Sequence, residues 1–273
     1  MILVFGKNGQ VANAIFNKNP SLIFLSHKDA PFEHPHLIFK QLDKYKPKIV
    51  INASAYTGVD KAESETSLSL QVNAHTPGEI AHWCRLNNST LIHYSTDYVF
   101  DGSGITPWVE TDTPSPINWY GHTKWESEKN IISTGCQHYI FRVSWIYSPV
   151  GHNFAKTIQK LAQEKKELRI VNDQWGAPTK ADDIAKTTLT LVDSLLSQNR
   201  TPNFGTYHLR YSPFMTWFDF AKIIIDESRK LGVPLTLEKL SPISSEDYPT
   251  PARRPKNSRL NTLYPNIFGS LSN

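Results

Sequence analysis

The chain is poor in cysteine. Cys84 and Cys136 are the only two among 273 residues, and they lie far apart, without a spacing typical of metal ligands. This argues against a disulfide pair and against a cysteine-bound metal. We expect two ordinary buried thiols in a reducing compartment, and therefore a cytoplasmic protein.

The chain also lacks long apolar runs and a strong charge of either sign. Stretches such as KIVINASAY are far too short to span a membrane, and the N-terminal MILVFG predicts a strand entering a turn rather than a targeting segment. The formal net charge is only +4, whereas nucleic-acid binding calls for a concentrated basic stripe. We therefore expect neither a membrane nor a nucleic-acid partner, and an anionic small substrate is compatible with this charge.

In the first half of the chain, short apolar runs alternate with helix-like stretches. The predicted strands are Ile2–Phe5, Leu22–Leu25, Ile49–Asn52, Leu91–Tyr94 and Tyr139–Val143, and the predicted helices are Val11–Asn17, Leu37–Tyr45, Ala74–Asn87 and Tyr120–Ile132. Strands that are separated by helices indicate βαβ units and a parallel sheet buried on both faces. The expected fold class is α/β, a Rossmann-type doubly wound parallel sheet with a smaller, discontinuous substrate-binding lobe.

After about Ser148 this regular pattern loosens. Two further helices are predicted, Phe154–Lys165 and Ala181–Ser197, and repeated prolines predict only short elements in the last third. We expect residues 1–147 and 180–210 to form the nucleotide-binding domain. Residues 148–179 and 211–273 would form the second lobe.

A glycine-rich turn follows the first predicted strand. In VFGKNGQVANAI, Gly6 permits a tight turn, Gly9 lets the backbone approach a pyrophosphate, and the next helix offers free N–H groups to phosphate. Ala12 occupies the place of a third glycine, where a small side chain serves helix packing. A plain strand-to-helix turn is the alternative, but the position directly after an apolar strand favours dinucleotide binding.

The end of the second strand bears on the choice of cofactor. Ser26, His27 and Lys28 stand where an acidic residue often holds the ribose of NAD. No carboxylate there would repel a 2′-phosphate, which favours NADPH over NADH, although an exposed loop with an incidental lysine is the alternative. Asp29 could still reach the adenosine.

The stretch NWYGHTKWESE places Tyr120 and Lys124 on one face of a predicted helix. A free tyrosine has a pKa of about 10, and a nearby ammonium that lowered it by about two units would supply close to 3 kcal/mol. Such a phenol can give its proton to an alkoxide formed from a ketone. The alternative is an exposed pair on an amphipathic helix.

Neighbouring strand ends favour the chemical interpretation. The strand in IHYSTDYVFDG ends at Thr96 and Asp97, and the preceding strand ends in small residues, Ala53 to Ala55, which allow a flat cofactor to lie close. Ligands of parallel α/β sheets bind at the carboxyl ends of strands. We therefore expect Thr96 to hydrogen-bond the same oxygen that Tyr120 protonates.

These residues resemble the extended short-chain dehydrogenase/reductases, and within them the reductases of nucleotide-linked 4-keto sugars. The matching stretches run from Gly6 to Leu260 and read FGKNGQVA, VINASAYTGVDKAESE, VNA, HYSTDYVFDG, PINWYGHTKWESE, FRVSWIY, GHNFAKT, VNDQWGAPT and TPARRPKNSRL. The resemblance implies reduction of the 4-keto group of a dTDP-linked 6-deoxyhexose to dTDP-rhamnose by NADPH, or by NADH. A homodimer is a candidate assembly.

The resemblance also implies roles for single residues. The catalytic residues would be Thr96, Tyr120 and Lys124. The cofactor would contact Gly6, Gly9, Gln10, Val11, Asp29, Ser54, Ala55, Tyr56, Tyr94, Tyr120 and Lys124. The substrate would contact Thr96, Asp97, Trp145, Asn153, Arg253 and Arg254, with Trp145 open to the alternative of a core aromatic and the two arginines to that of a solvated turn.

The chain departs from the family pattern in three places. Ser26 replaces a second-strand acid. Ala14 stands where some members carry a glutamate that binds an intersubunit magnesium, so we expect no metal. The family continues for longer after NSRL than this chain does, so we expect a short substrate-binding lobe with exposed apolar surface.

Two rival functions remain open. The 4,6-dehydratases of the family carry an Asp-Glu pair where this chain has Asp97 and Tyr98, so elimination lacks its glutamate, and the flanking motifs fit epimerases poorly. The first rival is a non-catalytic, NADP-binding regulatory subunit, like the β subunit of methionine adenosyltransferase, which belongs to another functional class. The second rival is a reductase of a different nucleotide 4-ketosugar.

Overall fold

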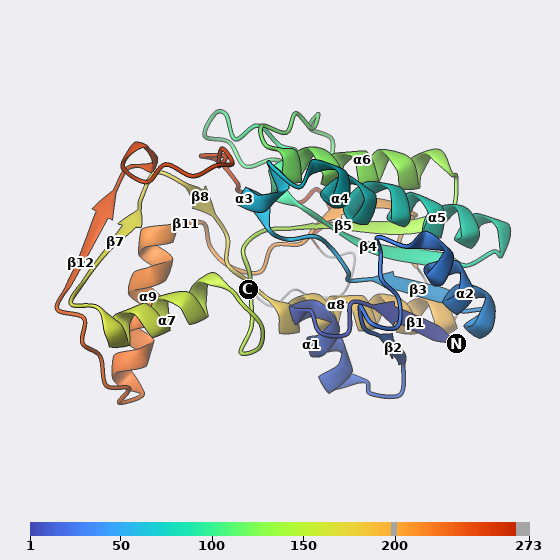
Figure 1. The fold of residues 1–273 in the computed structure, drawn as a ribbon, viewed down its shortest axis with the longest axis horizontal. Helices are drawn as coiled ribbons and strands as arrows, with labels where there is room; N and C mark the ends of the chain where they lie inside the picture. The colour runs from blue at the N-terminus through green and yellow to red at the C-terminus, as the bar shows by residue number, and fades with distance from the viewer. Residues whose placement is uncertain (198–200, 266–273) are drawn as a thin grey trace.

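The centre of the molecule is a six-stranded parallel sheet. The computed structural model describes residues 1–197 and 201–265 and orders the strands β10-β5-β4-β3-β1-β2 (Figure 1). The strands are β1 (Ile2–Phe5), β2 (Ile23–Leu25), β3 (Ile49–Asn52), β4 (Thr90–Thr96), β5 (Gln137–Val143) and β10 (Gly205–His208). Every neighbouring pair is parallel, and β1, β3 and β4 are buried along their whole length, as expected for a sheet covered on both faces.

Helices cover both faces of this sheet, so it is doubly wound (Figure 1). One face packs against α1 (Gln10–Lys18) and α8 (Ala181–Ser197), and the other against α2 (Pro35–Tyr45), α5 (Thr76–Leu86) and α6 (Trp119–Ser133). The strand order reverses between β1 and β3, because β1 leads to β2 on one side while β3 continues to the other. Such a switch point is where open α/β sheets bind ligands.

The predicted elements of the first half are confirmed within one or two residues at most ends. The exception is the helix expected over Ala74–Asn87, since its first residues belong to a π-helical turn, Gln71–His75, that precedes α5. The short helices α3 (Val59–Ala62) and α4 (Thr66–Leu70) lie before that turn and were not predicted. Neither was β10, a four-residue strand that completes the sheet.

A smaller lobe lies at the other end of the molecule (Figure 1). It contains α7 (Phe154–Glu164), α9 (Trp217–Lys230), the parallel pair β7 (Glu167–Val171) and β12 (Lys239–Ile243), and the antiparallel pair β8 (Trp175–Gly176) and β11 (Met215–Thr216). Its separate core joins residues such as Ile158, Phe220 and Leu237. The expectation of only short elements here was wrong: α9 has 14 residues and begins with a capping box between Thr216 and Asp219.

The last part of the described chain returns from the small lobe to the sheet domain. Asn257 donates its backbone N–H to the carbonyl of Gly102, and Trp108 and Leu260 form a bridge in which Trp108 N–H donates to the carbonyl of Arg259. A further pair, β6 (Ile146–Tyr147) with β9 (Thr179–Lys180), lies where the chain leaves and re-enters the sheet domain. The domain division proposed from sequence stays a prediction, and residues 266–273 lie outside the described part.

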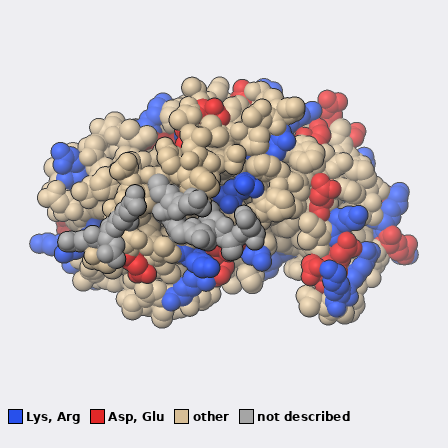
Figure 2. Space-filling model, turned by 180° about the vertical axis from the view of Figure 1, so that it is seen from behind, with Lys and Arg blue, Asp and Glu red and all other residues tan. Residues whose placement is uncertain are grey.

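The surface carries mixed charge. On the face drawn in Figure 2, lysine and arginine side chains of the described residues alternate with aspartate and glutamate. Ion pairs account for part of this pattern on the small lobe, among them Lys166–Glu238 and Lys239–Glu167. Among the residues that the structure describes, no helix is long and apolar enough to cross a membrane.

A buried ion pair joins α6 to the sheet. Arg142 of β5 donates from Nη2 to Glu128 of α6 at 2.6 Å, and these side chains are 4% and 0% exposed. Ser95 of β4 donates a short hydrogen bond to the same carboxylate. Both charges are therefore compensated, as buried charges must be.

Arg142→Met is expected to lower the free energy of unfolding by about 3–5 kcal/mol, because it leaves Glu128 buried without its cation. The double variant Glu128→Met/Arg142→Met should recover most of that loss. Denaturant unfolding of the three proteins checks this, and a double variant no more stable than the single one contradicts it.

Candidate active site

The glycine turn after β1 leaves room only for backbone. Gly6 has φ +88°, and a Cβ at this position would lie 2.5 Å from the carbonyl oxygen of Ala53. Gly9 is the N-cap of α1, whose first N–H groups receive no side-chain cap. An uncapped helix N-terminus beside a glycine cradle fits the pyrophosphate of a dinucleotide.

The loop after β2 is ordered by its own carboxylate. Asp29 accepts hydrogen bonds from the backbone N–H and the hydroxyl of Ser26, at 2.9 and 2.6 Å, and these bonds lower the pKa of Asp29. His27 lies 2.8 Å from Glu33. Ser26, which stands in place of the acidic residue of NAD-binding proteins, therefore has both of its hydrogen-bond donors occupied by the Asp29 carboxylate.

The segment after β3 is also held by side chains. Asn52 accepts from the N–H of Ser54, and Asn73 accepts from the N–H of Tyr56. The Tyr56 hydroxyl donates to Glu65 at 2.6 Å, which raises the pKa of Tyr56 to about 12. The predicted cofactor residues Ser54, Ala55 and Tyr56 thus lie just after the end of β3. Since β3 neighbours β1 in the sheet, this segment lies beside the glycine turn that follows β1.

Tyr120 and Thr96 are brought together as expected. Tyr120 is in the first turn of α6, which Asn118 caps by accepting from the N–H of Gly121. Burial and the charge of Asp97 raise the pKa of the Tyr120 phenol, and its hydrogen bond with Thr96 opposes that rise. Gly121 allows this approach, because a Cβ there would lie 2.1 Å from the carbonyl oxygen of Tyr98.

Lys124 lies one turn further along α6, with 1% of its surface exposed. Its Nζ donates to the backbone carbonyl of Tyr94 at 2.7 Å and lies 3.2 Å from Nε2 of His93. Burial lowers the pKa of Lys124 to about 8, against the opposing charge of Glu128. The expected lowering of the Tyr120 pKa by this lysine is not seen: the pKa of the phenol is shifted upward by burial and by the charge of Asp97.

Tyr94 points to the opposite face of the sheet. Its hydroxyl lies 2.6 Å from that of Thr188 on α8, and its ring packs in the core near Phe141. Only its backbone carbonyl reaches Lys124. The cofactor contact expected for Tyr94 stays a prediction, and its ring is held on the face of the sheet that packs against α8.

Asp97 is a buried acid among hydroxyl groups. Thr96 donates to one of its oxygens at 3.0 Å, and the hydroxyls of Ser144 and Ser258 lie within its electrostatic reach. Burial raises the pKa of Asp97 to about 6, and these three hydroxyl groups oppose the rise. Ser258 comes from the returning C-terminal segment, so distant parts of the chain meet at this carboxyl.

The two predicted arginines differ in their contacts. Arg254 forms an ion pair with Asp60 at 2.7 Å, and Asp60 also accepts from the N–H of Ala252. Arg253 has an exposed side chain, and its backbone carbonyl accepts from Asn118, the N-cap of the Tyr120 helix. Arg254 therefore secures the returning segment to α3, while the exposed side chain of Arg253 is available to a ligand.

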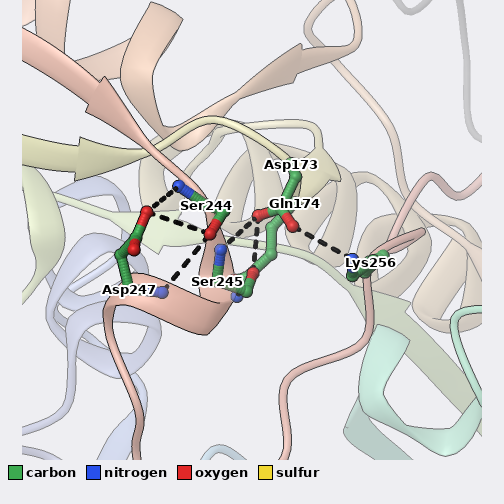
Figure 3. A network of polar contacts seen from close by, with 6 residues as sticks. All are labelled: Asp173, Gln174, Ser244, Ser245, Asp247 and Lys256. Atoms are coloured by element: carbon green, nitrogen blue, oxygen red, sulfur yellow. Dashed lines mark hydrogen bonds and ion pairs between the residues drawn. The ribbon is translucent and has the colours of Figure 1, made fainter.

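A groove of about 620 Å³ lies beside this segment. Its walls combine basic, aromatic and polar side chains from both lobes, including Ile117, Gln174, Ser245, Tyr248, Arg253 and Lys256. Figure 3 shows the network along one wall. Asp173 accepts from Ser245 at 2.6 Å and pairs with Lys256 at 3.1 Å, and Gln174 donates to Ser245 at 2.9 Å.

Trp145 and Asn153 lie where the two lobes join. Trp145 stacks on Trp217 of α9 with ring centroids 3.5 Å apart, and its φ of +49° is in the left-handed region that non-glycine residues rarely adopt. Asn153 caps α7 and donates to Gln10 of α1 at 2.9 Å. The substrate contacts expected for Trp145 and Asn153 stay predictions. The bond to Gln10, which directly follows Gly9, places Asn153 beside the glycine turn.

The sequence interpretation missed several polar residues around Lys124 and Asp97. They are Asn52, His93, Ser127, Ser144 and Ser258, each at most 3% exposed. The sequence did contain a signal for His93, because it interrupts the apolar run LIHYS and a buried strand admits a polar residue only when that residue has hydrogen-bond partners.

Cys84 and Cys136, distant in sequence, belong to one core cluster as free thiols. Among the described residues, no cluster of His, Cys, Asp or Glu could hold a metal ion.

Known proteins resemble this chain over nearly its whole length. The family model described as the RmlD substrate binding domain matches residues 1–266. The dTDP-4-dehydrorhamnose reductase of Escherichia coli K12 is 43% identical over 268 residues, which cover 96% of this chain and 89% of that protein.

Solved structures agree with that similarity. The dTDP-4-dehydrorhamnose reductase of Bacillus anthracis, in complex with NADP, superposes with a TM-score of 0.89 at 30% identity and covers 98% of this chain and 92% of its own. The corresponding reductase of Clostridium acetobutylicum has a TM-score of 0.85 at 33% identity, with 95% and 89% covered.

Asp97→Asn is expected to stabilise the protein at high pH. The pKa of Asp97 rises from 3.8 to about 6 on folding, so the folded state loses stability as the pH rises between these values and keeps that loss above them. At pH 8 the variant should gain up to about 3 kcal/mol in free energy of unfolding, and near pH 3, below both pKa values, almost nothing.

Denaturant unfolding at both pH values measures this difference. Asp193→Asn, which removes an exposed carboxylate of α8, is the control for net charge. An Asp97→Asn variant whose stability follows the pH exactly as the parent protein's does contradicts the prediction.

Proposed function

Because the chain belongs to the RmlD substrate binding domain family, we propose that it is a dTDP-4-dehydrorhamnose reductase. It reduces the 4-keto group of dTDP-4-dehydrorhamnose, with NADPH as hydride donor, and forms dTDP-rhamnose. The named relatives and the NADP-bound structure support this activity. The observation that carries it is the meeting of Tyr120, Thr96 and Lys124 at the carboxyl end of β4.

Tyr120 is the proton donor in this proposal. When bound, a reduced nicotinamide would supply hydride to the carbonyl carbon, and the substrate oxygen would then carry a negative charge. Burial keeps the phenol protonated until then, and an alkoxide is a far stronger base than phenolate, so a raised pKa does not prevent the transfer. Thr96, whose hydroxyl lowers the pKa of the Tyr120 phenol, would position the same oxygen.

The residues that would hold the cofactor lie at the switch point of the sheet. Gly6, Gly9, Gln10 and Val11 would surround the pyrophosphate at the N-terminus of α1, since this is where backbone can approach phosphate. Ser54 to Tyr56 would border its middle, and Lys124 its nicotinamide ribose. Lys28 and the lack of an acid directly at the end of β2 favour NADPH, Asp29 would lie near the adenosine, and NADH is the second cofactor for this site.

The nucleotide of the substrate would bind in the groove beside the returning segment. Its wall offers Arg253 and Lys256 to a diphosphate and Tyr248 to a base, and guanidinium groups suit phosphate oxygens. Asp97 and Trp145 would bound the sugar. We further propose a cytoplasmic location, and a homodimer stays a prediction.

Tyr120→Phe is expected to lower turnover by about 10²- to 10⁴-fold, because the alkoxide loses its proton donor while the fold keeps its ring. The affinity for NADPH should change little. Loss of reduced-nicotinamide absorbance with dTDP-4-dehydrorhamnose measures turnover, and fluorescence titration measures NADPH binding.

Tyr45→Phe, at the end of α2, is the matched control and should keep the parent rate. A Tyr120→Phe enzyme that retains most of its rate removes this phenol from the mechanism. A parent protein that binds NADPH but never turns over the sugar would instead indicate the regulatory subunit.

Arg253→Gln is expected to raise the KM for the nucleotide sugar about tenfold or more, with a small change in kcat, because it removes a charge-assisted hydrogen bond to phosphate. Arg229→Gln, on the last turn of α9, controls for net charge. Steady-state kinetics of both variants measures this difference. An unchanged KM in Arg253→Gln would mean that the nucleotide does not bind beside Arg253.

A further inference from the structure

A chain of buried polar groups extends beneath Lys124. His93 of β4 is 0% exposed and lies between Lys124 and Ser127 of α6 on one side and Asn52 of β3 on the other. Its Nε2 is 3.2 Å from the Lys124 Nζ and 3.1 Å from the Ser127 hydroxyl, and its Nδ1 is 3.0 Å from the amide nitrogen of Asn52. None of these contacts is needed by the proton transfer proposed above.

The orientation of Asn52 is decided by the backbone. Its carbonyl oxygen accepts from the N–H of Ser54 at 3.1 Å, so its NH₂ group must face His93. An NH₂ group only donates. Nδ1 of His93 therefore has to be the acceptor and carries no proton.

His93 is a neutral imidazole with its one proton on Nε2. Burial lowers its pKa well below the ordinary value, and the charges of Lys124 and His138 lower it further. Because Nδ1 accepts from Asn52, the single N–H of the neutral ring points toward Ser127 and Lys124. The tautomer thus follows from the hydrogen bonds, as a second partner usually decides it.

An ammonium cannot accept this hydrogen. When Lys124 is charged, the Nε2–H bond donates to Ser127, and two donors face each other across 3.2 Å. When Lys124 is a neutral amine, its lone pair can accept from His93. The contact therefore stabilises the amine relative to the ammonium.

We propose that His93 is a positioning residue that, held in the Nε2–H tautomer by Asn52, favours the neutral amine form of Lys124. The charge of Lys124 is then the balance between this imidazole and the groups that favour the ammonium. Those are the carbonyl of Tyr94 on β4 and the carboxylate of Glu128 on α6, which Arg142 of β5 partly neutralises.

The consequence for catalysis rests on the proposed function. Tyr120 precedes Lys124 by four residues, so the charge of the amine sets part of the field in which the phenol gives up its proton. Because the pKa of Lys124 is lowered to about 8, its charge changes just above neutral pH, and that field depends on pH. Asn52 and His93 would thus act on the reaction through Lys124, without touching the substrate.

The tautomer can be tested directly. Long-range ¹H–¹⁵N spectra of histidine-labelled, cofactor-free protein, with the signal assigned by His93→Gln, should show a protonated Nε2 and an unprotonated Nδ1. A protonated Nδ1 in the parent protein overturns the proposal.

The effect on Lys124 is tested by an isosteric change, Asn52→Asp. The carboxylate still accepts from Ser54 but now also accepts from Nδ1–H, so the tautomer reverses and Nε2 can accept from the ammonium. NMR titration of lysine labelled at Cε, with Lys124→Met for assignment, should show the Lys124 midpoint rising by about one pH unit or more. Ser127→Ala should lower it, because the amine becomes the remaining acceptor.

The carboxylate introduced by Asn52→Asp also attracts the Lys124 ammonium directly, which by itself raises the Lys124 midpoint. A double-mutant cycle separates this direct attraction from the effect of the reversed His93 tautomer. In the His93→Leu background, Asn52→Asp retains the charge but has no imidazole to reverse, so its shift should be clearly smaller. Equal shifts in both backgrounds overturn the proposal.

None of these titrations requires turnover. If the protein reduces dTDP-4-dehydrorhamnose, the pH profile of kcat should move with the Lys124 midpoint in Asn52→Asp and in Ser127→Ala. An inactive protein with the expected titrations sets aside the proposed function and leaves the assignment of His93 standing.

Discussion

The amino group of Lys124 lies in a part of the molecule from which water is excluded, and much of the surrounding structure compensates for the charge it can carry. Removing a charged amine from water disfavours its ammonium form, which is why burial lowers its pKa to about 8. The Tyr94 carbonyl of β4 and the Glu128 carboxylate of α6 favour the ammonium form, whereas the His93 imidazole of β4, 3.2 Å away, opposes it. The parallel sheet brings β4 beside α6 and so joins these groups.

The same packing connects Lys124 to the stability of the sheet domain. Glu128, one turn after Lys124, is the carboxylate that Arg142 and Ser95 hold in the core. β4 therefore supplies Ser95 to this ion pair, Thr96 to the phenol and the Tyr94 carbonyl to the lysine in three successive residues. Alternation along the strand turns the Ser95 side chain toward α6 and the Tyr94 ring toward α8, so Tyr94 reaches Lys124 only through its backbone carbonyl.

The returning C-terminal segment completes the site from the other lobe. It brings Ser258 to Asp97, the Arg253 carbonyl to the cap of α6, and Arg254 to Asp60. The N-terminus of the Tyr120 helix is therefore held by residues more than 130 positions later in the chain. In this segment Arg254 points to Asp60 while the Arg253 side chain is exposed, so two adjacent arginines have different contacts.

Local pattern was sufficient for most strands and helices of the first half of the chain and for the choice of the candidate site residues. Short apolar runs between amphipathic stretches predicted β1 to β5 and their helices, because hydrophobic periodicity reflects burial directly. β10 and α9 were missed: GTYH is too short to show a period, and the prolines that surround α9 outweighed its apolar face in the interpretation. Tyr120, Lys124, Thr96 and the glycine turn were found because each follows a strand end or shares a helix face.

What the sequence by itself determined was therefore the parallel sheet, the dinucleotide turn and the pairing of a tyrosine with a lysine one helical turn apart. Only the tertiary structure decided their electrostatics. The upward shift of the Tyr120 pKa, the buried acid at Asp97 and the tautomer of His93 depend on which groups exclude water and which donors meet which acceptors. Those relations join β3, β4, α6 and the C-terminal segment, and spacing along a chain carries no information about the dielectric environment that distant segments create together.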